Sequence, residues 1–204
     1  MKNPILSLTA LCGMAVILTS CDSRAKLSDS VQGIWAGTPQ QMTDTGAAKA
    51  TVTRLMEFTK TDDAGAGNIT LTAYITVENT MSANDSIVTP LTITASGTAS
   101  ITGVYQAKDD DDILLNLDTS SLTVNVDPEA VQLNYNVLTT GSQSQLVALK
   151  PADSVLATQQ ITRAAQSAFF NLREIEDIKI HGSIMTCEFG HQDFTFSRQE
   201  ESRP

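Results

Sequence analysis

The chain has 204 residues, of which 13 are Lys or Arg and 23 are Asp or Glu, giving a formal net charge of −10. An acidic surface of this kind repels phosphate backbones, so the composition argues against nucleic acid as a partner. The length suits a single domain with its own hydrophobic core.

Residues 1–20 have the layout of a secretory signal peptide. Lys2 forms a short basic start, and an apolar stretch follows from Ile5 to Leu18. This stretch is shorter than the ~20 apolar residues that a membrane-spanning helix needs. We therefore expect a cleaved leader rather than an uncleaved anchor.

The leader ends in Leu18-Thr19-Ser20-Cys21. This ending resembles the bacterial lipoprotein signal, in which an aliphatic residue and small residues precede a cysteine. The resemblance implies cleavage between Ser20 and Cys21, and attachment of lipid to the Cys21 thiol. Several acyl chains together hold a protein stably at a membrane. The alternative is an ordinary signal peptide with a cysteine nearby by chance.

The implied location is the cell envelope, with a membrane as the partner reached through the lipid. We expect the outer membrane rather than the inner one, and the face that carries the domain stays open. Loss of the leader removes Lys2 and no acidic residue, so the charge of −10 becomes −11. Residues 21–31 are mainly polar and predict a tether, followed by a single β domain over 32–204.

The first half of this domain is rich in strand signals. Residues 33–37 and 51–59 favour strands, and 62–68 have turn composition. Over 69–78 apolar and polar residues alternate with a period of two, which is typical of a sheet with one face on the core. A further β-rich stretch covers 87–107.

Shorter strands are expected in the second half, with one helix. Acidic residues 109–112 predict a solvated loop before strands at 113–117, 122–126 and 131–137. Apolar residues at helical spacing predict a helix over 151–173. The chain then predicts a final hairpin, with one arm from Ile178 to Phe189 and the other over 194–198.

Many antiparallel strands with short turns favour a sandwich or an up-and-down barrel. Gly33-Ile34-Trp35 resembles the Gly-x-Trp opening of lipocalins and related calycin barrels, in which the tryptophan plugs the closed end beneath a basic residue of the last strand. Arg198, at the end of Phe194-Thr195-Phe196-Ser197-Arg198, matches that residue. The order of elements is also similar to small lipocalin-like lipoproteins of Bacteroidetes. The resemblance implies a mainly β protein with a barrel of about eight strands and one helix before the last hairpin.

Two functions remain open, and both are non-catalytic. The first is binding of a small apolar ligand inside the barrel, with Met56, Phe58, Leu71, Ile75 and Phe196 as the inward-facing candidates. The second is a structural or protein-interaction role in the envelope, with a filled barrel. The small number of aromatic residues favours the second.

The sequence contains no motif for catalysis, cofactor binding or a metal site. It has no nucleophile elbow, phosphate loop or metalloprotease helix, so we expect no enzyme and no cofactor. His181 and His191 have no Cys, His or acidic neighbours at zinc-ligand spacing. Cys187 lies in an alternating strand pattern, which predicts a buried and unreactive thiol.

Overall fold

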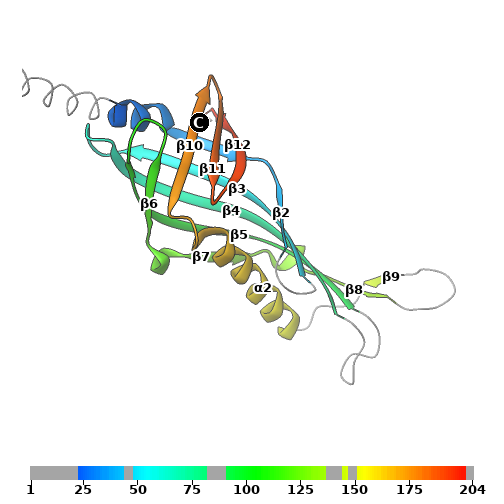
Figure 1. Cartoon of the computed structure of the whole chain (residues 1–204). Helices are drawn as coiled ribbons and strands as arrows, with labels where there is room; N and C mark the ends of the chain where they lie inside the picture. Colours follow the sequence, from blue (N-terminus) through cyan, green and yellow to red (C-terminus); the bar gives the residue numbers. More distant parts are fainter. Residues whose placement is uncertain (1–22, 44–47, 82–90, 137–143, 147–150, 201–204) are drawn as a thin grey trace, which may run out of the picture.

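The computed structural model describes residues 23–43, 48–81, 91–136, 144–146 and 151–200, and its centre is a closed antiparallel β-barrel (Figure 1). Each barrel strand pairs with the next barrel strand along the chain, and the last pairs with the first. The eight strands are β1 (Gly33–Gly37), β3 (Ala48–Lys60), β4 (Ala66–Met81), β5 (Leu91–Ala107), β6 (Ile113–Leu117), β10 (Glu174–His181), β11 (Ile184–Phe189) and β12 (Gln192–Gln199). The expected up-and-down barrel of about eight strands is confirmed.

The alternation in β4 gives this strand one buried face along its length. Its five alternate apolar residues are each at most 2% exposed, whereas Tyr74 between them is 53% exposed. These five are Ile69, Leu71, Ala73, Ile75 and Val77. A period of two therefore separates core from solvent along this strand, as predicted.

The strands β3, β4 and β5 are much longer than the barrel needs. One half of each strand belongs to the barrel, and the other half belongs to an open sheet. In this sheet β2 (Gln40–Thr43) pairs with β3, while β7 (Thr123–Val126) and β8 (Gln132–Asn136) pair with β5. The short strand β9 (Ser144–Leu146) continues this sheet beyond β8. Short 3₁₀ turns, Thr119–Ser121 and Pro128–Ala130, flank β7.

The predicted helix is α2 (Pro151–Phe169), which packs on β4, β5 and β7 (Figure 1). Its buried face consists of Ala157, Ile161, Ala164, Ala165, Ala168 and Phe169. A Cβ added to Gly97 of β5 would lie 3.2 Å from the Ile161 side chain, so the helix lies close against the open sheet there. Small residues on both elements allow this close approach.

The end of the chain has one turn more than we expected. Residues 178–189 do not form a single arm, because a turn at Gly182-Ser183 separates β10 from β11. Gly182 has a φ of +62°, which glycine adopts without strain. Three strands, not a lone hairpin, therefore follow α2.

The prediction of a polar tether up to residue 31 is wrong in its second part. Residues 23–31 form a helix, and Leu27, Ser28 and Val31 on it are buried. Figure 1 shows this helix beside one end of the barrel. Cys21 and residues 1–20 lie outside the described residues, as does the part of the predicted stretch 87–107 before Leu91.

Candidate functional site

The three residues that carried the barrel resemblance meet where the first helix enters β1. Trp35 is fully buried and lies directly opposite Arg198 of β12, whose guanidinium carbon is 4.5 Å from the centre of the indole ring. The indole Nε1 donates a hydrogen bond to the Val31 carbonyl oxygen at 2.7 Å. Arg198 Nη2 donates to the Ser30 carbonyl oxygen at 2.6 Å. Both side chains thus satisfy carbonyl groups at the helix end that have no intrahelical partner.

Gly33 makes the turn between that helix and β1. Its φ is +103°, which lies in the region where side chains are strained. The Gly-x-Trp pattern therefore has a local cause: the glycine turns the chain, and the tryptophan two residues later points into the barrel.

A second set of contacts ties the same helix to two more strands. The Tyr105 hydroxyl of β5 lies 2.8 Å from Ser28 Oγ, and Gln32 Nε2 donates to that hydroxyl at 2.8 Å. Gln32 Oε1 accepts from the backbone N–H of Lys60 in β3 at 2.6 Å. Gly67 lies opposite Tyr105, and any Cβ there would collide with the tyrosine ring. Sequence reasoning missed Ser28 and Gln32, although Leu27 and Val31 at i and i+4 form a short helical signal.

The five residues predicted to line a ligand site are all buried. Four of them lie on the barrel, whereas Ile75 lies opposite Val52 and Gly97, in the part of β4 that belongs to the open sheet. Each is between 1 and 2% exposed, and all belong to one hydrophobic core that includes Trp35. Phe58 meets Tyr105 edge-on with ring centres 5.3 Å apart, and Phe196 meets Phe189 edge-on at 6.1 Å. These side chains pack on other side chains of the protein, as do the neighbouring Met56, Leu71 and Ile75.

Arg54 shares the inner face of β3, at the place where the barrel passes into the open sheet. Its Nη1 donates to Gln40 Oε1 at 3.0 Å, and its guanidinium carbon lies 5.2 Å from the centre of the Phe194 ring. Its buried Nε has no partner among the described residues. Burial lowers the pKa of this guanidinium, because the charged form has lost contact with water.

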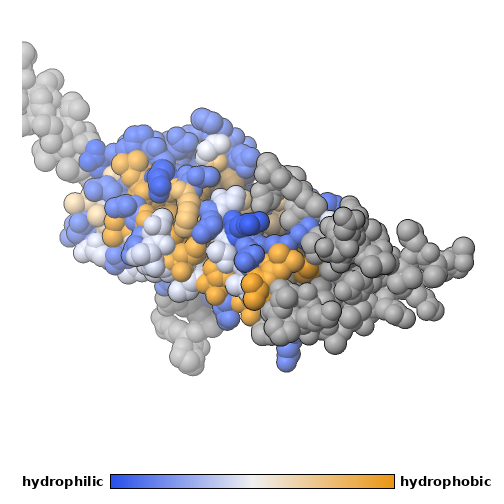
Figure 2. Space-filling model, turned by 90° about the horizontal axis from the view of Figure 1, so that it is seen from below, coloured by the Kyte–Doolittle hydropathy of each residue, from blue (hydrophilic) through white to orange (hydrophobic). Residues whose placement is uncertain are grey.

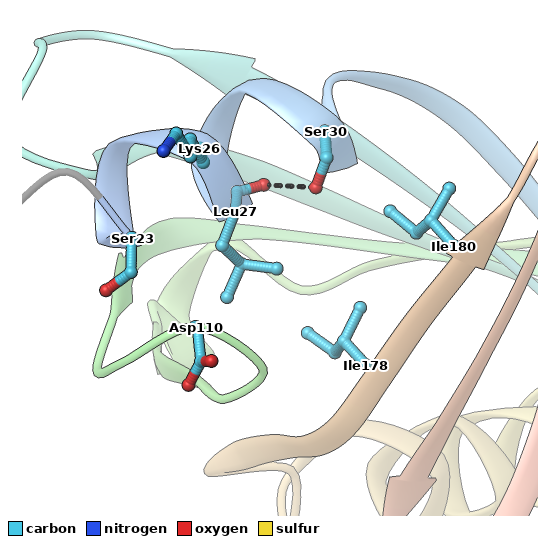
Figure 3. Close-up of a pocket in the computed structure, with 7 residues that line it drawn as sticks. All are labelled: Ser23, Lys26, Leu27, Ser30, Asp110, Ile178 and Ile180. Carbon is cyan, nitrogen blue, oxygen red and sulfur yellow. Dashed lines mark hydrogen bonds between the residues drawn. The ribbon is translucent and has the colours of Figure 1, made fainter.

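A groove of about 610 Å³ lies at the barrel end that holds the first helix (Figure 3). Its apolar wall is formed by Leu27 from the helix and by Ile178 and Ile180 from β10. Its polar lining is Ser23, Lys26, Ser30 and Asp110. The groove therefore offers an apolar surface with charged groups of both signs at its rim. It contains none of the five predicted interior residues.

Figure 2 shows apolar residues in patches between hydrophilic ones on one face of the molecule. The acidic residues 109–112 form a loop that contacts the bulge of β10, since the Asp111 carbonyl accepts from the Ile178 N–H at 2.8 Å. Asp112 Oδ1 accepts from the Asp177 N–H at 3.2 Å, and Lys108 Nζ lies 2.8 Å from Glu174. The loop thus helps to close the barrel between β6 and β10.

The cysteine and the two histidines of the last three strands and their turns differ in exposure and in neighbours. Cys187 is buried, and burial raises the pKa of its thiol to about 12. His181 is exposed at the end of β10. His191 lies with Glu176 and Glu188 in a cluster whose oxygen and nitrogen atoms are all within 4.8 Å of one another. Sequence spacing did not reveal this cluster, because strand pairing brings its members together.

Comparison with known proteins adds no family to this description: no protein-family model matches the chain, and no curated protein matches its sequence. The lipocalin-like character therefore rests on the antiparallel eight-stranded barrel itself. Among the described residues, no helix has the length and apolar character required to span a membrane.

Proposed function

We propose that the chain is a non-catalytic, lipid-anchored protein of the cell envelope, whose barrel is a filled scaffold for interaction with other envelope components. The observation that carries the scaffold role is the burial of Met56, Phe58, Leu71, Ile75 and Phe196 in one core with Trp35. Side chains that pack on one another leave no apolar surface for a ligand to cover.

The anchor in this proposal is Cys21, supported by the residues Leu18 to Cys21 and the leader before them. Substitution Cys21→Ala removes the thiol that would carry the lipid. We expect the native chain in the membrane fraction of its host, and no lipid mass on the variant. Recovery of the native chain without added lipid would contradict the proposal.

The scaffold role is tested by native mass spectrometry of the mature chain, purified gently from its own envelope. We expect a mass that equals the lipidated polypeptide alone. A small molecule that leaves only when the barrel unfolds would refute a filled interior and favour ligand binding there.

A second function, binding of one lipid chain, is favoured by the groove in Figure 3. Ser23 lines this groove, and Cys21 lies two residues earlier, a reach of at most about 7 Å. A groove so close to the anchor would face the membrane that holds it. Ile180→Asp would then remove a co-purifying lipid, whereas Ile184→Asp, at an exposed position of the next strand, would not.

A further inference from the structure

We propose that Glu176, Glu188 and His191 form a surface site for a divalent transition-metal ion of the Zn²⁺ type. The three residues come from β10, from β11 and from the turn that joins β11 to β12. One potential ligand atom of each lies within 4.8 Å of the other two. Ligands at ~2.1 Å from a shared zinc ion are ~3.4 Å apart, so rotamer changes of the three side chains suffice to close the set.

The register of the strands supports a cation at this place. Glu176 lies directly opposite Glu188 in the β10–β11 pair, and Glu188 lies directly opposite Asp193 in the β11–β12 pair. Like charges at directly opposed positions destabilise a sheet. Among the described residues no Lys or Arg forms an ion pair with Glu176, Glu188 or Asp193. A bound divalent ion would supply the missing positive charge.

Two irregularities of the backbone lie beside the three residues. A bulge between Glu176 and Lys179 places two residues of β10 against one of β11, and Asp177 within it has a φ of +52°. His191 has a φ of +66° beside Gly190 at +55°, the geometry of a two-residue hairpin turn. Glycine usually occupies the second position of such a turn, and histidine, like asparagine, is one of the few other residues enriched at positive φ. The turn places the imidazole next to Glu188.

The chemical nature of the three ligand atoms determines which class of metal ion the site would bind. One imidazole nitrogen with two carboxylates suits zinc and neighbouring transition metals, whereas calcium and magnesium prefer oxygen ligands alone. Three protein ligands also leave coordination positions for water or for a group of a partner molecule.

The test is titration of the full mature chain in detergent with Zn²⁺ alone, followed by calorimetry. We expect one saturable site, which His191→Asn and Glu188→Gln each weaken by roughly tenfold or more. Asparagine keeps the turn geometry at position 191 while it removes the imidazole. His181→Ala is the matched control, because it removes the other histidine of the chain, and its affinity should stay within about twofold of the native value.

Three results of the Zn²⁺ titrations would overturn the site. They are the absence of saturable Zn²⁺ binding by the native chain, an unchanged affinity in His191→Asn, and an equal loss of affinity in His181→Ala. Displacement of Zn²⁺ by an equal concentration of Ca²⁺ would also refute it, because that outcome indicates attraction by acidic residues alone. Circular dichroism of each variant separates a lost ligand from a lost fold.

Discussion

At the scale of single residues, the barrel end depends on a few side chains that perform two tasks. Trp35 is fully buried in the core and also donates to the helix carbonyl of Val31. Arg198 covers the indole ring and also binds the carbonyl of Ser30. Each side chain therefore couples the first helix to the core, and its loss affects both.

Trp35→Ala should lower the free energy of unfolding by ~3–5 kcal/mol, the usual cost of deleting a large buried aromatic side chain. Urea denaturation measures this difference. Tyr74→Ala, at a 53% exposed position of β4, is the control and should change stability by about 0.5 kcal/mol or less. Equal effects of the two substitutions would show that Trp35 does not lie in the core.

Cys187 gives a prediction that depends on pH. Its thiol pKa is raised to about 12 by burial, whereas an exposed thiol titrates near 9. The folded state therefore keeps a proton that the unfolded state loses as the pH rises from about 9 to 12. Because the unfolded state then binds fewer protons, this group makes the fold less stable across that window.

The same burial makes Cys187 slow to react with a thiol reagent at neutral pH in the native protein. We expect rapid labelling only after denaturant is added. Labelling of the folded chain at the rate of a free cysteine would contradict the buried position in β11.

At the scale of elements, the open sheet and α2 depend on close packing of small residues. Ala165 is fully buried on the helix face toward the sheet, and Gln166 beside it is exposed. Ala165→Leu should destabilise the protein by ~1–3 kcal/mol, because the added atoms find no space. Gln166→Leu on the same helix should change stability by about 0.5 kcal/mol or less in the same urea experiment. A neutral Ala165→Leu would mean that α2 is not packed on β4 and β5.

The sequence allowed the elements with a strong period to be predicted. β4 and α2 follow from the alternation over 69–78 and from the helical spacing after Pro151. The first helix was missed, because residues 23–31 are short and mostly polar and acquire their stability from contacts with Tyr105, Trp35 and Lys60. The turn at Gly182 was missed because apolar residues continue on both sides of it.

The candidate sites likewise divide into one that the sequence predicted and others that it did not. The Trp35–Arg198 contact corresponds to a recognisable sequence pattern at the two ends of the domain. The groove beside Leu27 and the cluster at His191 combine residues that are distant in sequence, so only the register of the strands brings them together. Arg54 could have been noticed as a charged residue at an inward position of β3.

At the scale of the whole molecule, the proposed function gives the barrel and the lipid on Cys21 separate roles. The barrel is a closed eight-stranded unit with a buried hydrophobic core, and the described part of its first helix begins at Ser23, two residues after Cys21 in the sequence. In the proposed function, this short connection keeps the barrel end beside the first helix, with its groove, next to the membrane. The acidic surface would keep the domain away from anionic lipid headgroups by charge repulsion.

The most direct test of this account is the mass of the mature protein, measured from its own envelope under native conditions and again after denaturation. We expect both spectra to show a chain that begins at Cys21 and carries a lipid modification, with no small molecule lost on unfolding. A chain that begins elsewhere or lacks lipid would contradict the anchor, and a ligand released on unfolding would contradict the filled barrel.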